Sequence, residues 1–460
     1  MENKGFLNMV KGDKVIWIVV LMLIMISMIT ISGSTSLLAI QNKCTRLDII
    51  WKQGLITLAG LGLIFLCYVI PNSKTFEWLS RGGFIFSLIL LIALDSHFRI
   101  SRDFRAVEFN GVYRAILIKG FQVHVFEIVK VAMVMYIAWA CKAIRQGKLT
   151  TLKFFAHLKF GKQAKEPLQC LDTEWGRVIY YIFIPILLIT GLIIPGGNSS
   201  TIFILGIMII TAFVGEIDPR KIAVLAMTGI ALLGIAFGIY KLTDGAVFQR
   251  IGTMIERVSE KPTIEEIIQM KEDGREGTTA YKKKMIKVQQ PYSAKIAIHE
   301  GGLFRKGVGG STQKYVVPVM YGDFIYCYIL EETGLLGGIL IILLYLSLIA
   351  RGVKVVKNCQ DLFAQTSVAG LIILITSQAF MHIAINLDMG PLTGQTLPLV
   401  SQGSSAFLCF CVAFGIVLSM SKMSWEEISE EERQADMARG RMSVEQVEEA
   451  AEGAEDEKNA

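Results

Sequence analysis

The amino-acid sequence predicts an all-α, polytopic membrane protein with about ten transmembrane helices. The chain is 53% hydrophobic and only 19% charged, and its mean hydropathy is +0.51, so its apolar share exceeds that of soluble domains. The apolar residues fall in repeated stretches of about 17–25 residues, as bilayer-spanning helices require. Because hydrocarbon offers the backbone no water to bond, each stretch is expected to be helical. A soluble protein with many buried helices is the weaker alternative.

Ten apolar stretches are expected to span the bilayer, which places both termini on one side. The stretches are Val15–Ser32, Leu55–Ile70, Gly83–Leu94, Val123–Ala140, Val178–Ile194, Thr201–Val214, Ile222–Tyr240, Phe324–Ala350, Ser367–Ile385 and Leu397–Met420. With the N-terminus inside, the short inner segments carry 18 Lys and Arg residues and the short outer segments carry 8. Basic residues accumulate on the cytoplasmic side, so both termini are predicted to be cytoplasmic.

Two segments are expected to lie outside this ten-helix domain of residues 1–424. Residues 241–322 form a long extracytoplasmic loop between the seventh and eighth spans, with a short helix from a capping box at Thr263–Glu266 to Lys271. A second helix is expected from Pro291 to the glycine turn at Gly301. Residues 425–460 carry 13 acidic and four basic residues, which predicts a disordered cytoplasmic tail.

Asp323 is the sharpest candidate for chemistry, because it lies where the long outer loop enters the eighth span. A carboxylate there can take a proton from a sugar hydroxyl, or it can simply cap the helix. Glu331 and Glu332 follow about two turns further on, so at least one of them must face protein or water.

Three further features have both a functional and a structural interpretation. Glu127 and Lys130 can form an i,i+3 ion pair, either in a substrate path or between helices. The outer arginines Arg99, Arg102, Arg105 and Arg114 suit a diphosphate or ordinary lipid headgroups. Residues 386–405 contain glycines and prolines that break a helix beside a cavity or form a plain outer turn.

Other classes of protein are not supported. The eight cysteines are scattered without CxxC or metal-ligand spacing. The chain carries no Walker, HExxH, haem or Rossmann pattern, and no feature calls for nucleic acid.

Several segments together resemble the FtsW/RodA/SpoVE (SEDS) family. The strongest are residues 295–314, Asp323-Phe324-Ile325, residues 331–337 and Pro391–Ser405, and weaker matches occur at residues 111–114 and 127–130. The chain departs from the family pattern at Val125-Phe126, at residues 318–322 and at Gln402-Gly403-Ser404. The matches keep chain order across nearly all spans.

The resemblance implies a peptidoglycan glycosyltransferase that polymerises lipid II into glycan strands at the outer face of the inner membrane. Its implied partners are a class B penicillin-binding transpeptidase of the FtsI type and other divisome membrane proteins. The runs at residues 311–314 and 393–401 favour the septal, FtsW-like branch over the RodA-like elongation branch. A flippase for lipid-linked precursors, or a scaffold for the transpeptidase, are the alternatives.

The resemblance also implies roles for individual residues. Asp323 is the catalytic base for the acceptor 4-hydroxyl, which attacks the anomeric carbon of an undecaprenyl-diphosphate donor with inversion. No residue is assigned as a metal ligand, but a divalent cation, Mg²⁺ or Mn²⁺, can accompany the diphosphate. The substrate-binding residues are Arg114, Glu127, Lys130, Lys306, Gln313, Lys314, Ser401, Gly403, Ser404 and Ser405.

Overall fold

The computed structural model describes most of the ten predicted spans and part of the outer loop. The described residues are 11–41, 43–70, 72–96, 101, 104–109, 112–147, 173–243, 264–274, 278–303, 306–307, 309–317, 320–390 and 393–428. The predicted capping box at Thr263 and the acidic tail beyond Ile428 lie outside these residues.

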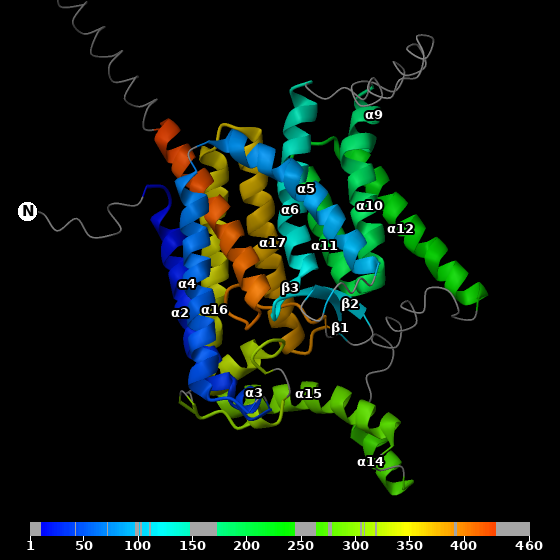
Figure 1. Ribbon diagram of the computed structural model, residues 1–460, viewed down its shortest axis with the longest axis vertical. Helices are drawn as coiled ribbons and strands as arrows, with labels where there is room; N and C mark the ends of the chain where they lie inside the picture. Colours follow the sequence, from blue (N-terminus) through cyan, green and yellow to red (C-terminus); the bar gives the residue numbers. More distant parts are fainter. Residues whose placement is uncertain are drawn as a thin grey trace, which may run out of the picture.

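Each predicted span corresponds to a helix of one bundle (Figure 1). Seven helices are long and apolar enough to cross a membrane, as judged over the described residues. The ten helices are α2 (Lys14–Ser34), α4 (Arg46–Val69), α5 (Ser73–Asp95), α6 (Val125–Arg145), the composite Glu174–Gly196, α11 (Asn198–Val214), α12 (Pro219–Leu242), α16 (Ile325–Asn358), α17 (Leu362–Asn386) and the C-terminal helix Ser404–Ile428. The fold class is therefore confirmed.

The composite helix changes its winding along its length. It consists of α9 (Glu174–Val178), a π-helical turn η1 (Ile179–Phe183), α10 (Ile184–Ile193) and a 3₁₀ turn η2 (Ile194–Gly196). Pro185 lies at the start of α10 and supplies no N–H for the preceding turn, which accounts for the wider winding there.

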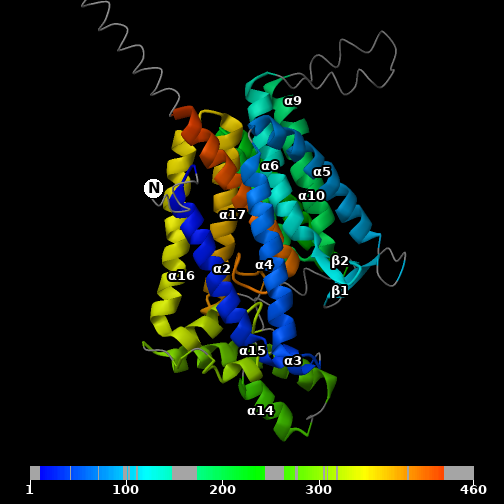
Figure 2. The same ribbon diagram turned by 60° about the vertical axis from the view of Figure 1, so that its left-hand side comes forward.

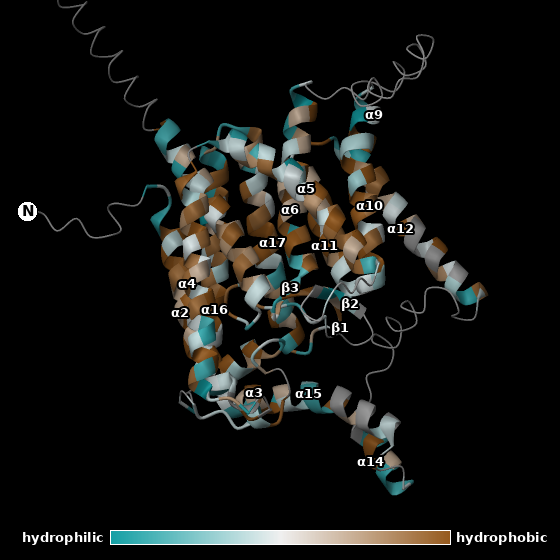
Figure 3. Cartoon of the chain, viewed as in Figure 1, coloured by the Kyte–Doolittle hydropathy of each residue, from teal (hydrophilic) through white to brown (hydrophobic). Residues whose placement is uncertain are grey.

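The centre of the bundle is formed by α6, α17 and the C-terminal helix. The most apolar window of α17 is 61% buried and that of the C-terminal helix is 78% buried, against 28% for α4 and 22% for α5. The apolar residues of α4 and α5 therefore face outward, as expected for helices in contact with lipid. Figure 3 shows the hydrophobic colour over the bundle and hydrophilic residues gathered at its ends.

The first and last described residues, near Lys11 and Ile428, lie at the same end of the bundle. Asp13, which caps α2 through bonds to the backbone N–H groups of Val15 and Ile16, also pairs with Arg351 at 2.6 Å. Lys11 pairs with Glu426 of the C-terminal helix at 2.9 Å. This arrangement agrees with the even number of predicted spans.

A small sheet covers part of the opposite end and was not predicted. Strands β1 (Phe104–Phe109), β2 (Val112–Ile118) and β3 (Phe121–His124) pair antiparallel in the order β1-β2-β3. The β2–β3 turn is Lys119–Gly120, and both residues have the positive φ that two-residue hairpins require. Because β3 runs directly into α6, the fourth span begins at Val125 rather than Val123.

The long outer loop contributes two helices at the same end as the sheet. The predicted short helix is α14 (Ile264–Glu272). The second helix, α15 (Thr279–Gly301), begins twelve residues before the predicted start and contains Pro291 in its interior. Thr278 caps it by accepting from the backbone N–H of Tyr281, and Gly302, with φ of 52°, ends it. Figures 1 and 2 show α15 lying across the end of the bundle.

Two predicted spans are interrupted. The eighth is broken at Gly334, where φ is 72° and ψ is −172°. The freed backbone groups find partners in the outer loop: Leu335 N–H donates to Gly302 O at 3.0 Å, and Gly307 N–H donates to Glu332 O at 3.1 Å. The tenth helix begins at Ser404 instead of Leu397, because residues 393–403 are non-helical.

Residues 395–401 of the non-helical segment 393–403 are mostly buried, so the interpretation of this stretch as a plain outer turn is wrong. Val400 is fully buried and Leu397 is 1% exposed. Side chains from α2, α16 and α17 satisfy its carbonyls: Ser27 donates to Val400 O, Tyr345 to Pro398 O and Gln378 to Thr396 O. Irregular backbone inside a bundle requires such partners.

Candidate active site

Asp323 lies in the turn that immediately precedes α16. The N-cap of α16 is Phe324, whose own side chain makes no capping hydrogen bond. The interpretation of Asp323 as an ordinary helix cap is therefore wrong, and its half-buried carboxyl group is not used to satisfy the first turn of α16.

The buried segment 393–403 holds this turn through hydrogen bonds. Ser401 Oγ donates to the carbonyl of Gly322 at 2.9 Å and accepts from the backbone N–H of Leu397 at 2.8 Å. The backbone N–H of Gln402 donates to Tyr321 O at 3.0 Å. The predicted site residue Ser401 therefore lies directly under the Asp323 turn, with its hydroxyl group engaged by the protein.

The surroundings of Asp323 make it a better base than a surface aspartate. Burial raises the pKa of its carboxyl group to about 6, against a smaller lowering by the positive charge of Arg114. A carboxylate with a pKa near 6 is still ionised at neutral pH and holds an abstracted proton more strongly than an exposed one. The arrangement is suited to general-base chemistry.

Arg114 brings the sheet into this site. It lies on β2, and its Nε donates to the carbonyl of Gly196 at 2.8 Å, at the end of the composite helix. Gly197 has φ of 147°, and a Cβ there would meet Arg114 Nη2 at 2.8 Å. The guanidinium group of Arg114 therefore lies directly against Gly197, where a side chain would have to displace it.

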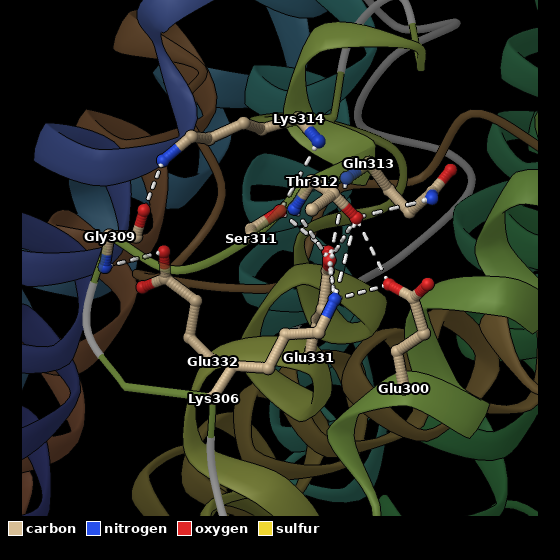
Figure 4. Close-up of polar contacts among 9 residues, drawn as sticks. All are labelled: Glu300, Lys306, Gly309, Ser311, Thr312, Gln313, Lys314, Glu331 and Glu332. Atoms are coloured by element: carbon tan, nitrogen blue, oxygen red, sulfur yellow. Dashed lines mark hydrogen bonds and ion pairs between the residues drawn. The ribbon is translucent and has the colours of Figure 1, made fainter.

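A second polar cluster surrounds the end of the first segment of α16 (Figure 4). The fully buried Glu331 accepts from Ser311 Oγ at 2.5 Å and from the backbone N–H of Thr312 at 2.7 Å. Lys306 Nζ lies 3.3 Å from Glu331 and also pairs with Glu300 of α15. Glu332 accepts from the backbone N–H of Gly309 at 2.8 Å. Both glutamates face protein. The sequence predicted that at least one of them would face protein or water.

The other two predicted residues of the outer loop are also engaged in this cluster. The buried Lys314 donates to the carbonyl of Gly309 at 2.7 Å. The side chain of Gln313 donates to Thr312 Oγ1 at 3.4 Å, and its backbone N–H points to Glu331. Lys306 and Gln313 thus fasten the loop to Glu331 of α16, whereas Lys314 bonds within the loop. The binding of substrate by these three residues stays a prediction.

The ion pair predicted within the fourth span is present in the bundle interior. Lys130 is 2% exposed, and its Nζ lies 2.8 Å from Glu127 Oε1. It also donates to Gln378 of α17 at 2.8 Å and to Gln395 of the buried segment at 2.7 Å. A buried cation needs this number of acceptors, so Lys130 joins three parts of the bundle.

The last three predicted residues lie at the start of the C-terminal helix. Gly403 precedes the helix and its carbonyl accepts from Phe407 N–H at 2.8 Å, whereas Ser404 is half-buried at the first helical position. The buried Ser405 accepts from the backbone N–H of His124 at 3.0 Å, so it joins this helix to β3. The binding of substrate by Gly403, Ser404 and Ser405 stays a prediction.

Three buried polar residues of this region were not among the predicted site residues. Asn386, Gln378 and His382 all lie on α17, spaced by four residues, and all are at least 98% buried. His382 Nδ1 lies 2.8 Å from the carbonyl of Gln395. Their regular spacing on one face of an apolar helix was the available signal, because polar side chains at membrane depth are costly unless paired.

The outer arginine cluster is only partly described. Arg99 and Arg102 lie outside the described residues, and Arg105 is half-buried on β1. Within the described part of the chain, no group of three or more His, Cys, Asp or Glu side chains is arranged to hold a metal ion.

The family model described as "Cell cycle protein", which covers FtsW, RodA and SpoVE, matches residues 13–426. Caulobacter vibrioides probable peptidoglycan glycosyltransferase FtsW is 39% identical over 124 residues, 27% of this chain and 32% of that protein. Bacillus subtilis stage V sporulation protein E is 36% identical over 129 residues, 28% of this chain and 35% of that protein. These matches span about a third of each relative. Geobacter metallireducens FtsW is 26% identical over 314 residues, covering 68% of this chain and 70% of that protein.

Solved structures share the fold. A chain of a peptidoglycan synthase complex that coordinates polymerization and crosslinking has a TM-score of 0.58 at 17% identity, covering 90% of this chain and 98% of that chain. Thermus thermophilus rod shape determining protein RodA has a TM-score of 0.53 at 18% identity, covering 89% and 97%. The resemblance drawn from the sequence is thus confirmed, and this multi-pass membrane chain belongs to the FtsW/RodA/SpoVE family.

Proposed function

We propose that this protein is a peptidoglycan glycosyltransferase that polymerises lipid II at the outer face of the cytoplasmic membrane. One observation carries the proposal: Asp323 presents a half-buried carboxyl group with a pKa of about 6, under the influence of Arg114, at the end of the bundle opposite the termini. The names of the relatives from Caulobacter vibrioides and Geobacter metallireducens support it.

In the proposed reaction, ionised Asp323 removes the proton from the 4-hydroxyl of the acceptor GlcNAc. The hydroxyl oxygen forms a bond to the anomeric carbon of the donor, and the bond from that carbon to the diphosphate oxygen breaks with inversion. The diphosphate leaves with the electron pair, and Arg114 is the described cation best placed to stabilise its charge. Asp323 returns its proton to solvent.

A divalent cation, Mg²⁺ or Mn²⁺, is a further element of the proposal. The described residues do not form a protein cation site by themselves, so any ion would depend on the diphosphate for most of its ligands.

We further propose a class B penicillin-binding transpeptidase of the FtsI type as partner, other divisome proteins as neighbours, and action at the septum. The fold shared with a chain of a peptidoglycan synthase complex supports a transpeptidase partner. Relatives named FtsW favour the septal role, and an Escherichia coli relative named MrdB, 36% identical over 129 residues, keeps the elongation role as the alternative.

The proposal is tested with the purified full chain, its transpeptidase partner and lipid II. Asp323→Asn should abolish glycan polymer, because the amide cannot accept the proton. Asp388→Asn is the matched control, since Asp388 also lies at this end and pairs with Lys295 on the surface at 2.8 Å; it should retain activity. Polymer formation by Asp323→Asn would overturn the assignment.

A flippase is the second candidate, favoured by the buried ion pair of Lys130 and Glu127 inside the bundle. Reconstituted vesicles with fluorescent lipid II distinguish the two. Translocation without polymer would support the flippase, and polymer that depends on Asp323 would support the glycosyltransferase.

A further inference from the structure

The carbonyl groups of the Asp323 turn have partners from one neighbouring stretch of chain. Tyr321 O accepts from the backbone N–H of Gln402, and Gly322 O accepts from Ser401 Oγ. The next carbonyl, that of Asp323, accepts from Asn386 Nδ2 at 3.0 Å. Three consecutive residues are therefore held by residues 386–402, which include the last residue of α17.

The contact from Asn386 differs from the other two because the same amide also reaches the first turn of α16, where helix N–H groups have no intrahelical partner. In a regular α-helix the N–H of Cys327 would donate to the carbonyl four residues earlier, which belongs to Asp323. Here Cys327 N–H donates to Asn386 Oδ1 at 3.2 Å instead. The next bond of the series, Tyr328 N–H to Phe324 O, is regular at 3.1 Å.

The amide of Asn386 is used completely. Its Nδ2 also donates to the carbonyl of His382 at 2.9 Å, and its Oδ1 also lies 3.1 Å from the thiol of Cys327. The residue is 2% exposed. A side-chain amide carries two donor hydrogens and two acceptor sites, so no hydrogen-bonding capacity remains for substrate.

We infer that Asn386 is a positioning residue, whose side-chain amide bridges the carbonyl of Asp323 and the first-turn N–H of Cys327 and thereby holds Asp323 in a turn beside α16. Without the inserted amide, the carbonyl of Asp323 and the N–H of Cys327 would approach each other and draw Asp323 into the first helical turn. The inference rests on the proposed function, because it assigns a role within the same site.

The geometry explains why an amide is needed at this position. An aspartate at 386 would keep an acceptor for Cys327 but, when ionised, would face the carbonyl of Asp323 with a second acceptor. An alanine would leave both backbone groups without their partner, at a cost of about 1–3 kcal/mol per buried group, or let them join.

The test compares Asn386→Ala and Asn386→Asp with Ser419→Ala in the full chain. Ser419 is a matched control because it is fully buried and donates to a backbone carbonyl, that of Ile70, at 3.2 Å, at the end of the bundle where the termini lie. Both Asn386 variants should lower kcat by about tenfold to hundredfold through misplacement of the base, with KM for lipid II nearly unchanged.

Two readouts separate positioning from general destabilisation. The acid limb of the kcat–pH profile should move when the carboxyl group leaves its present surroundings, and hydrogen exchange in a peptide covering residues 321–330 should change. Ser419→Ala should alter neither. If Asn386→Ala fails to fold, the near-isosteric Asn386→Asp carries the test.

The outcomes distinguish this inference from the proposed function. Polymer that depends on Asp323, combined with unchanged kcat, pH profile and exchange in the Asn386 variants, would overturn the positioning role alone. A wild-type protein that makes no polymer would overturn the proposed function. In that case, unchanged hydrogen exchange of residues 321–330 in the Asn386 variants would also show that Asn386 does not hold the Asp323 turn.

Discussion

At the scale of single residues, the balance of two opposing effects sets the properties of Asp323. Removal from water disfavours the charged carboxylate and raises its pKa, whereas the nearby positive charge of Arg114 favours it. The first effect is the larger, which leaves a pKa of about 6. Since only the ionised form can take a proton, we expect polymerisation to fall as the pH drops through about 6.

The sign of the Arg114 contribution leads to a prediction. Arg114→Met removes the charge that stabilises the carboxylate, so the pKa of Asp323 should rise and the acid limb of the rate–pH profile should move to higher pH. The measurement is the initial rate of polymer formation as a function of pH. Gly197→Ala should move the limb in the same direction. A Cβ at position 197 would lie 2.8 Å from Arg114 Nη2, so the guanidinium group would have to shift.

One contrary result and one control test this role of Arg114. A limb that does not move in Arg114→Met would show that Arg114 does not act on the base. Gly120→Ala is the control for the glycine change, since it also has a positive φ but no atom within 4 Å of its Cβ position; it should leave the limb in place.

At the scale of secondary-structure elements, interrupted helices form the site. The break of α16 at Gly334 leaves backbone groups that the outer loop satisfies through Gly302 and Gly307. Directly before the break, Glu331 and Glu332 receive donors from residues 306–313. The break, the loop and the two glutamates therefore form one unit, which anchors the outer loop next to the segment that carries Asp323.

The break gives a prediction about stability. Gly334→Ala should lower the free energy of unfolding by about 1–3 kcal/mol, because φ of 72° with ψ of −172° is a conformation that only glycine adopts without strain. Thermal unfolding of the purified protein in detergent measures the effect. Gly62→Ala is the control, since Gly62 lies in α4 with nothing near its Cβ position and should be neutral or slightly stabilising. Equal transition temperatures for the two variants would contradict this explanation of the break.

At the scale of the whole molecule, the Asp323 site and the ion pairs near the first and last described residues lie at opposite ends of the bundle. Asp13, Arg351 and Glu426 form ion pairs at one end, and the sheet, α15 and the Asp323 turn lie at the other. Between them, Lys130 is bonded to Glu127, Gln378 and Gln395 deep in the interior. The breaking of such a buried pair is costly, so this contact holds α6, α17 and the buried segment in register.

The excess of basic residues beside the termini predicts the orientation in the membrane. In a cysteine-free variant, Glu265→Cys on the exposed face of α14 should react with a membrane-impermeant maleimide in cells whose outer barrier is permeabilised. Lys357→Cys, exposed at the end of α16 near the termini, should react only after the cytoplasmic membrane is opened. The reverse pattern would place Asp323 in the cytoplasm and remove the proposed polymerase function.

The sequence by itself determined the ten spans, the shared side of the termini, the family and the position of Asp323 between loop and helix. These properties depend on hydropathy and on short motifs, which are local along the chain. Only the tertiary structure decided the small sheet, the break used by the outer loop, the buried course of residues 393–403 and the insertion of Asn386 beside Asp323. Those features depend on hydrogen bonds between residues far apart in sequence, such as the 63 positions between Asp323 and Asn386, and no local pattern specifies which buried donor will meet which carbonyl.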